Sequence, residues 1–305
     1  MDNKLLIAVL GPTAIGKTAL AIKLAQHYGT EIISADSRQF FKEMQIGTAV
    51  PSASELDQAK HHFIQHISIS DKYSVGHFEK DALDRLKTVF DDHKIAIMVG
   101  GSGLYVDAVL KGLDNLPKVD PAIRQELNVK LAENGLQELQ EILKIQDPNH
   151  YNNVDLDNPQ RVLRALEVCI FTGKPYSSFL SKNKVKRPFK SLKIGLSADR
   201  EIIYDRINRR VDLMMEQGLE DEARSLYDQK ELNALNTVGY KELFAYFEGK
   251  TTKTEAISEI KKNTRRFAKR QLTWYRKDPD IKWFDHHYDL KKITEVIDQH
   301  LKRTL

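Results

Sequence analysis

Residues 11–18 read GPTAIGKT, which matches the phosphate-loop pattern G-x-x-x-x-G-K-[ST] at every fixed position. An apolar run over residues 4–10 precedes the motif and predicts a short strand, and residues 19–28 are rich in helix formers and end before Gly29. A strand, a glycine loop and a helix N-terminus in this order direct several backbone N–H groups and the positive end of the helix dipole at one point. The sequence therefore predicts a binding site for a phosphate or a diphosphate.

The side chains of this loop add a charge and a metal ligand to the predicted anion site. Lys17 is suited to neutralise terminal phosphate oxygens, and the Thr18 hydroxyl is suited to ligate a Mg²⁺ ion that bridges them. The motif does not by itself name a reaction. The predicted diphosphate-binding residues are Gly11, Thr13, Ala14, Ile15, Gly16, Lys17 and Thr18.

The composition is that of a soluble globular protein, and it excludes several kinds of site. Of the 305 residues, 41% are hydrophobic and 30% are charged. The single cysteine, Cys169, lies in an apolar helical pattern, so disulfides and four-cysteine zinc sites are excluded. Because no apolar run suits a membrane span or a secretory signal, we expect a cytoplasmic monomer without a membrane partner. The net charge of +4 is only mildly basic, so a nucleic-acid contact would depend on where the charges lie.

Two further strand patterns lead into polar residues. Residues 31–36 form an apolar run that ends in Asp36, and residues 94–99 form another that leads into GGSGLY at 100–105. Ligands of doubly wound sheets gather at the carboxyl ends of the strands, so we expect Asp36 and Ser102 at the same edge as the phosphate loop. A helix or turn cap is the other interpretation of Asp36.

The middle of the chain differs from both ends. Residues 120–179 show helical periods and turn breaks but no strand pattern, and a strand candidate at 192–196 returns the chain to the sheet. We predict an α/β fold, a P-loop NTPase-like parallel sheet flanked by helices, with an inserted all-helical subdomain. The core is assigned to residues 1–115 and 192–305, and the insertion to residues 116–191.

Two stretches of the chain are strongly basic. Residues 261–282 interleave lysines and arginines with Phe267, Trp274 and Tyr275, which suits either a nucleic-acid contact or a helix with one packed and one solvated face. The other stretch could contact a polyanion or form a solvated linker. Its basic residues are Lys182, Lys184, Lys186, Arg187, Lys190 and Lys193.

Seven motifs follow one another in an order that is typical of one family. They are GPTAIGKT at 11–18, ISADSRQ at 33–39, IGTA at 46–49, GGSGLY at 100–105, QRVLRALEV at 160–168, TVGYKEL at 237–243 and TRRFAKRQLTWYRKD at 264–278. With these motifs the sequence resembles the tRNA dimethylallyltransferases (tRNA isopentenyltransferases) of bacterial type over nearly its whole length. It departs from the family pattern at Phe41, where tyrosine is common, and at Val50, where lysine is common.

The resemblance implies a reaction and a role for several residues. The reaction is transfer of the dimethylallyl group from dimethylallyl diphosphate to N6 of the adenosine 3′-adjacent to the anticodon, position 37, in tRNAs reading codons that begin with U. The phosphate loop and a Mg²⁺ cofactor would hold the diphosphate leaving group. Asp36 would take the N6 proton as a general base, Ser102 would orient the adenine, and Arg224 would bind the diphosphate.

The resemblance also implies that tRNA is the partner and that the adenine leaves the anticodon-loop stack to reach the site. Contacts are expected at the sheet edge, on the helical insertion and on the basic C-terminal segment. The predicted tRNA-binding residues are Asp36, Ser37, Arg38, Gln39, Ser102, Arg124, Gln160, Arg161, Val162, Leu163, Arg164, Arg265, Arg266 and Lys269.

Three other functions would use part of this pattern. A small-molecule kinase would bind ATP in the same loop, but it predicts an arginine-rich lid and gives the helical insertion no role. A transferase acting on free adenine nucleotides would need less surface for tRNA. An RNA-binding NTPase switch would keep its biological role when Asp36 is replaced by alanine.

Overall fold

The computed structural model describes residues 4–180 and 185–304. Contacts within the chain divide it into a core unit, Met1–Lys111 with Arg187–Leu305, and an insertion unit, Gly112–Lys186. These bounds lie close to the limits of 116 and 191 that the sequence suggested, and we propose that the two units are separate domains.

The core unit contains a six-stranded sheet in which every neighbouring pair is parallel. Strand order is β3-β2-β4-β1-β5-β6. The sequence analysis missed β3 and β6, because β3 has only two residues and β6 is largely exposed and lacks an apolar run. The strands are β1 (Leu5–Leu10), β2 (Ile32–Ser34), β3 (His61–His62), β4 (Ile95–Val99), β5 (Lys190–Ser197) and β6 (Lys282–Asp285).

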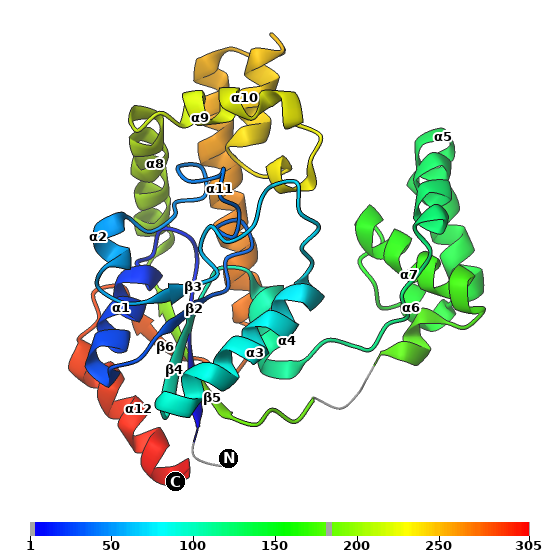
Figure 1. Ribbon diagram of the computed structural model, residues 1–305. Helices are drawn as coiled ribbons and strands as arrows, with labels where there is room; N and C mark the ends of the chain where they lie inside the picture. The colour runs from blue at the N-terminus through cyan, green and yellow to red at the C-terminus, as the bar shows by residue number, and fades with distance from the viewer. Residues whose placement is uncertain (1–3, 181–184, 305) are drawn as a thin grey trace. The chain divides into compact units, whose positions relative to one another are not determined.

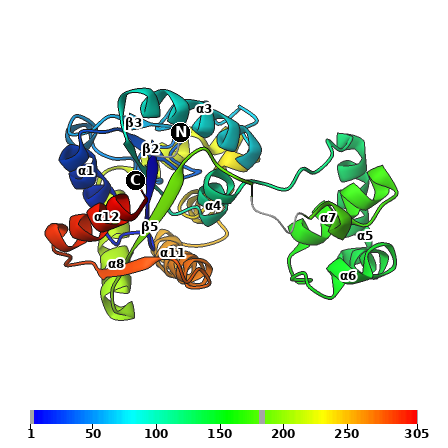
Figure 2. The ribbon, with the colours of Figure 1, turned by 90° about the horizontal axis from the view of Figure 1, so that it is seen from below.

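Helices cover both faces of this sheet, which confirms the predicted α/β class (Figure 1). Consecutive residues of β1 face opposite sides: Leu5 belongs to an apolar cluster that includes residues of α1, α8 and α12, and Leu6 belongs to one that includes residues of α3 and α4. Figure 2 shows these two groups of helices on opposite sides of the strands. The helices of the core unit are α1 (Lys17–Tyr28), α2 (Ala53–Leu56), α3 (Val75–Asp92), α4 (Gly103–Lys111), α8 (Arg200–Glu216), α9 (Leu219–Ser225), α10 (Tyr240–Phe247), α11 (Lys253–Tyr275) and α12 (Leu290–Thr304).

The helix α11 fastens a second layer of helices to the sheet. Its N-terminal half shares an apolar cluster with α8, α9 and α10 through Ile260. Near its C-terminus, the side chain of Gln271 donates a hydrogen bond to the carbonyl of Gly101 at 2.9 Å, and the Tyr275 hydroxyl donates one to the carbonyl of Gly100 at 3.3 Å. Since Gly100 follows β4 directly, α11 is fixed against the carboxyl edge of the sheet.

Two residues of the basic stretch at 182–193 are part of the core unit. The Arg187 guanidinium donates to the carbonyls of Ala108 and Val109 and pairs with Glu79. The Lys193 ammonium lies 2.7 Å from a carboxylate oxygen of Asp278, and the side chain is only 11% exposed. These contacts favour structural roles over a polyanion contact for both residues. Lys182 and Lys184 lie outside the described residues.

The described residues of the insertion unit, 112–180 and 185–186, form helices, turns and irregular segments but no strand. Its core is formed by leucines and valines of α5 and α7, including Leu139, Leu143 and Leu166. Gly135, with φ 80°, interrupts the helical conformation inside α5. The helices are α5 (Pro121–Gln146), α6 (Pro148–Tyr151) and α7 (Pro159–Thr172), followed by the 3₁₀ turn Tyr176–Phe179. Across the described chain, no helix combines the length and the apolar character needed to cross a bilayer.

A buried carboxylate joins the two long helices of the insertion. Glu167 on α7 is 6% exposed, and its two oxygens accept from Arg124 at 2.7 Å and from Arg164 at 3.0 Å. Removing this charge leaves two partly buried guanidinium groups without their shared acceptor. The ion pairs of Glu167 with these two arginines therefore contribute to the stability of the α5–α7 contact.

We expect Glu167→Gln to lower the free energy of unfolding of the insertion by about 1–2 kcal/mol, because charge-assisted hydrogen bonds are lost at partly exposed arginines. Urea titrations followed by circular dichroism measure the change. Glu141→Gln is the matched control, since Glu141 is exposed and lies 3.8 Å from Lys144 on the same unit. Equal stability of the two variants would contradict the proposed role of Glu167.

Candidate functional site

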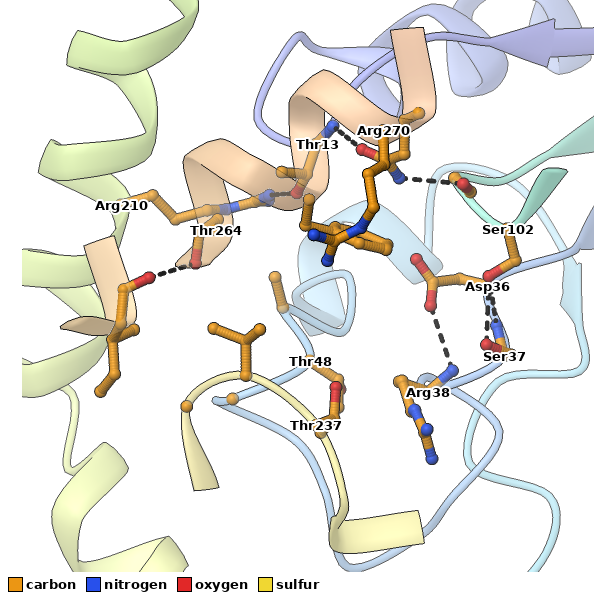
Figure 3. Close-up of a pocket in the computed structure, with 18 of the residues that line it drawn as sticks. Thr13, Asp36, Ser37, Arg38, Thr48, Ser102, Arg210, Thr237, Thr264 and Arg270 are labelled. Carbon is orange, nitrogen blue, oxygen red and sulfur yellow. Dashed lines mark hydrogen bonds between the residues drawn. The ribbon is translucent and has the colours of Figure 1, made fainter. Parts of the chain in front are cut away.

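A pocket of about 570 Å³ opens at the carboxyl ends of β1, β2 and β4, and all its lining residues belong to the core unit (Figure 3). The phosphate loop, the segment after β2 and the glycine turn after β4 each supply part of its wall. Further lining residues come from α4, from α8, α9, α10 and α11, and from the residues that precede α10. The polar residues of the lining include Thr13, Asp36, Ser37, Ser102, Arg210 and Arg270.

The loop after β1 has the backbone geometry that its glycines require. Gly11 has φ 143°, and a Cβ at this position would lie 2.5 Å from the carbonyl oxygen of Leu196 on the neighbouring strand. Gly16 has φ 105° and directly precedes α1. Both positions exclude ordinary side chains. The loop thus brings the N-terminus of α1 to the edge of the sheet, as the sequence predicted.

Lys17 begins α1, and its ammonium donates a hydrogen bond to the carbonyl of Pro12 at 2.7 Å. Burial lowers the pKa of Lys17 to about 8, against the attraction of Asp36, and the nearby charge of Arg210 lowers it further. Because burial destabilises the charged form of Lys17, a bound anion would stabilise that form strongly. This environment suits a phosphate ligand.

Arg210 is the guanidinium that the structure brings to the phosphate loop. It projects from α8, lines the pocket and donates a 3.3 Å hydrogen bond to the Thr13 hydroxyl (Figure 3). Burial lowers its pKa, and Asp36 opposes that shift. One turn earlier on α8, Arg206 donates to the carbonyl of Ala14 at 2.7 Å. The sequence analysis missed Arg210. The three arginines within residues 206–210 were the available signal, but the sequence does not show which side of this helix faces the pocket.

Arg224, the arginine expected at the diphosphate, is not brought to this pocket. Its guanidinium pairs with Glu220 at 2.9 Å, lies 4.1 Å from the ring centroid of Phe247, and is 55% exposed. Arg224 is not among the pocket-lining residues. The short helix α9 directs Arg224 away from the cavity, so Arg210 replaces it as the candidate.

Asp36 and Ser102 lie in one pocket, although 66 positions separate them in the sequence. One Asp36 oxygen accepts from the backbone N–H of Arg38 at 3.1 Å, and Figure 3 shows the other oxygen directed into the pocket. The Ser102 hydroxyl lies 3.1 Å from the Ser37 hydroxyl and accepts the Ser37 N–H at 3.2 Å. Asp36 therefore has a carboxylate oxygen available to a ligand, and its other oxygen caps a turn.

Arg38 and Gln39 are more deeply engaged in the fold than the sequence suggested. The Arg38 guanidinium donates to the carbonyls of Asn233 and Ala234 at 3.0 and 2.9 Å, although Arg38 also lines the pocket. The Gln39 amide donates to the carbonyls of Thr48 and Ala49 at 3.2 and 2.8 Å. Both side chains therefore hold neighbouring loops in place around Asp36.

The helix α11 presents a face other than its most basic one to the pocket. Phe267 and Trp274, which are 39% and 40% exposed, line the cavity together with Arg270. Arg265 instead donates to Asn208 at 2.7 Å, and Arg266 donates to Asn263 at 3.3 Å. The tRNA-contacting residues proposed on this helix, Arg265, Arg266 and Lys269, do not line the pocket, whereas Phe267, Arg270, Gln271 and Trp274 do.

Gln271 joins the phosphate loop to the glycine turn. Its side-chain oxygen accepts the backbone N–H of Thr13 at 2.8 Å, and its amide donates to the carbonyl of Gly101 at 2.9 Å. The residue is 5% exposed. Since both polar atoms have partners, this buried carboxamide fixes the spacing between the loop and the turn that carries Ser102.

In the insertion unit, the structure corrects two of the residues predicted to contact tRNA. The side chains of Val162 and Leu163 are fully buried in the core of the unit and cannot reach a ligand. Arg124 pairs with Glu167 and donates to Gln160, and Arg164 also pairs with Glu167. Arg161 is exposed and lies 3.8 Å from Asp155.

The fold and the pocket define the class of protein, an α/β protein of the P-loop type with a phosphate-loop motif beside a carboxylate. The sequence model of a family described as IPP transferase matches residues 39–278. The chain belongs to this family, and it is of the bacterial type.

Sequence relatives and solved structures agree with this membership. The chain is 65% identical to a tRNA dimethylallyltransferase of Christiangramia forsetii, covering 96% of this chain and 97% of that protein, and 56% identical to one of Flavobacterium johnsoniae, covering 99% and 100%. The crystal structure of a tRNA isopentenylpyrophosphate transferase from Bacillus halodurans superimposes with a TM-score of 0.74 at 38% identity, covering 99% of this chain and 98% of that one. The structure of a eukaryotic dimethylallyltransferase described as acting on tRNA superimposes with a TM-score of 0.76 at 27% identity, covering 97% of this chain and 77% of that one.

The pKa of Lys17 predicts that anion binding weakens above about pH 8. As the pH rises through that value, the free protein loses the positive charge that a diphosphate would contact. We expect the affinity for inorganic diphosphate to fall about tenfold more between pH 7 and pH 9.5 in the wild type than in Lys17→Arg, whose guanidinium keeps its charge. Calorimetric titrations measure both affinities, and identical pH profiles would contradict the prediction.

Proposed function

We propose that this protein transfers the dimethylallyl group from dimethylallyl diphosphate to N6 of the adenosine at position 37, 3′-adjacent to the anticodon, in tRNAs reading codons that begin with U. The products are N6-isopentenyladenosine in tRNA and diphosphate. The single observation that carries this proposal is that Thr13 of the phosphate loop and Asp36 line one pocket. The names of the relatives give independent support.

The donor end of the pocket suits a diphosphate leaving group. Thr13 of the phosphate loop lines this end, the Arg210 guanidinium donates to its hydroxyl, and Lys17 follows four positions later, at the start of α1. Lys17 and Thr18 are not among the lining residues, so we propose that their contacts form when the diphosphate is bound. As the C–O bond of the donor breaks, its electron pair passes to the bridging oxygen, and these groups stabilise the charge that develops. An allylic carbon bears much positive charge at that stage, so stabilisation of the leaving group is the main contribution to rate.

A Mg²⁺ ion fits this end of the pocket when the ligand supplies most of its oxygens. Thr18, in the first turn of α1, offers a hard hydroxyl oxygen beside the loop. Among the described residues, no group of three His, Cys, Asp or Glu side chains could hold a metal alone. Mg²⁺ commonly keeps water and binds through phosphates plus one or two protein oxygens. Bound in this way, it would neutralise charge on the departing diphosphate.

The acceptor end of the pocket suits an adenine. The lone pair of an exocyclic amine is delocalised into the ring, so N6 attacks more readily when a base takes its proton. The pocket-facing oxygen of Asp36 is suited to accept that proton, and the Ser102 hydroxyl, held by Ser37, is suited to orient the ring. N6 thus forms the new bond to carbon while its proton passes to Asp36.

The rim of the pocket suits a single-stranded nucleic-acid loop. Phe267 and Trp274 offer exposed rings on one side of α11, with the guanidinium of Arg270 between them along the helix. We propose that the rings stack on bases beside the flipped adenosine. Arg265, Arg266, Lys269 and the polar residues Arg124, Gln160, Arg161 and Arg164 of the insertion remain proposed contacts to the tRNA backbone.

The experiment that tests the function is incorporation of radiolabelled dimethylallyl diphosphate into unmodified tRNA with Mg²⁺ present. AMP as acceptor and ATP hydrolysis are run in parallel. Label in the tRNA at position 37 is the expected result. Label only in AMP would indicate a free-nucleotide transferase, and ATP turnover without transfer would indicate a kinase or an NTPase switch.

Asp36→Asn should lower the turnover of tRNA prenylation by about 10²–10⁴-fold, because a general base is lost while the shape of the side chain is kept. Binding of tRNA should stay near the wild-type value in filter-binding assays. Asp91→Asn, on the exposed end of α3, serves as control. Normal turnover in Asp36→Asn would remove Asp36 from this role.

Replacing Arg210 should affect the donor far more than replacing Arg224. We expect Arg210→Ala to lower kcat/KM for dimethylallyl diphosphate by about 10²–10³-fold, since a charge on the leaving group loses its partner. Arg224→Ala should stay within about threefold, because an exposed ion pair contributes little. Steady-state kinetics at saturating tRNA measure both values. The opposite ranking would restore Arg224 as the diphosphate ligand.

A further inference from the structure

One carboxylate outside the reacting groups holds a wall of the pocket. Glu222 on α9 accepts hydrogen bonds from three consecutive backbone N–H groups, those of Gln45, Ile46 and Gly47, at 2.9, 2.7 and 2.8 Å. It also accepts the Tyr240 hydroxyl at 2.7 Å. All four partners are donors, so only an acceptor on every side, a carboxylate, satisfies them together.

The loop that Glu222 holds is part of the pocket wall. Gly47, Thr48 and Ala49 line the cavity. From the other side, the Gln39 amide donates to the carbonyls of Thr48 and Ala49. A Cβ at Gly47 would lie 2.7 Å from ring atoms of Tyr240, so the loop backbone lies directly against that ring. The loop is therefore held by Glu222 and Tyr240 on one side and by Gln39 on the other.

The same contact joins the loop to the apolar part of the pocket. Leu219, one turn before Glu222 on α9, lines the cavity, and so does Val238, two residues before Tyr240. Val211, Met214 and Ile260 also contribute to the apolar lining. A shift of the loop relative to Glu222 would widen the space beside these side chains.

We propose that Glu222 is a positioning residue that, with Tyr240, fixes the width of the apolar part of the pocket and so determines which prenyl chain length is accepted. The proposal rests on the proposed prenyl transfer. Each additional buried methylene strengthens binding, so attraction alone would favour a longer chain over a five-carbon one. Discrimination against longer chains therefore requires a rigid pocket wall. The four hydrogen bonds of Glu222 make the loop at residues 45–49 rigid.

The test compares Glu222→Gln with Glu220→Gln. The NH2 group of a glutamine side chain cannot accept a hydrogen bond, so the first variant keeps one acceptor oxygen and loses the other. Glu220 lies on the same helix but pairs with Arg224 and Lys253, away from the pocket. For each protein, kcat/KM is measured with dimethylallyl diphosphate and with geranyl diphosphate, the ten-carbon donor, at saturating tRNA.

We expect Glu222→Gln to lower the preference for the five-carbon donor by about tenfold or more, and Glu220→Gln to leave it unchanged. A general loss of stability would lower kcat/KM equally for both donors. An unchanged ratio of the two kcat/KM values therefore overturns the proposal. Tyr240→Phe keeps the ring against Gly47 and removes one hydrogen bond, and it should give a smaller shift in the same direction. If Glu222→Gln does not fold, the ratio in Tyr240→Phe decides.

Hydrogen exchange separates this proposal from the proposed function. In Glu222→Gln, amides 45–47 should exchange at least about tenfold faster than in the wild type, whether or not the protein transfers a prenyl group. Unchanged exchange would show that Glu222 does not hold the loop. If exchange is fast in Glu222→Gln but the wild-type protein transfers no label to tRNA, Glu222 holds the loop and the transfer reaction is refuted. The proposed selection of chain length is then refuted with it.

Discussion

The parallel pairing of β1, β4 and β2 is the constraint on which the pocket depends. Val99, the last residue of β4, lies opposite Val9 of β1 and opposite Ser34 of β2. Parallel strands that end at one level release their following residues at one edge of the sheet. The phosphate loop, the glycine turn with Ser102 and the segment with Asp36 therefore meet, although 89 positions separate Gly11 of the loop from Gly100 of the turn.

A second constraint comes from outside the sheet. The buried Gln271 has a partner for each polar atom, one on the phosphate loop and one on the glycine turn. An unsatisfied carboxamide in this place would cost about 1–3 kcal/mol, so the helix α11 has one favourable position against the edge. That position brings Phe267, Arg270 and Trp274 to the pocket. The same residue thus fixes the proposed acceptor rim and the proposed donor loop.

The surroundings of two arginines support the proposed role of Arg210, rather than Arg224, in binding the diphosphate. Arg210 is partly buried beside Lys17 and Asp36, where a cation is costly unless an anion compensates it. Arg224 is exposed and already paired with Glu220. Both lie on helices rich in charged residues, and helical periodicity alone does not say which face meets the sheet edge. The same ambiguity explains Val162 and Leu163, which lie in a family motif but form the core of the insertion.

The sequence by itself determined the phosphate loop, the α/β class, the helical insertion and the positions of Asp36 and Ser102, because each follows from a local pattern or from the end of a predicted strand. Only the tertiary structure assigned Arg210, Gln271 and Glu222, since their partners lie more than a hundred residues away in the chain. Local patterns specify strands, turns and caps through neighbouring residues. Which distant side chain completes a buried hydrogen bond depends on helix rotation and packing, which the whole fold decides together.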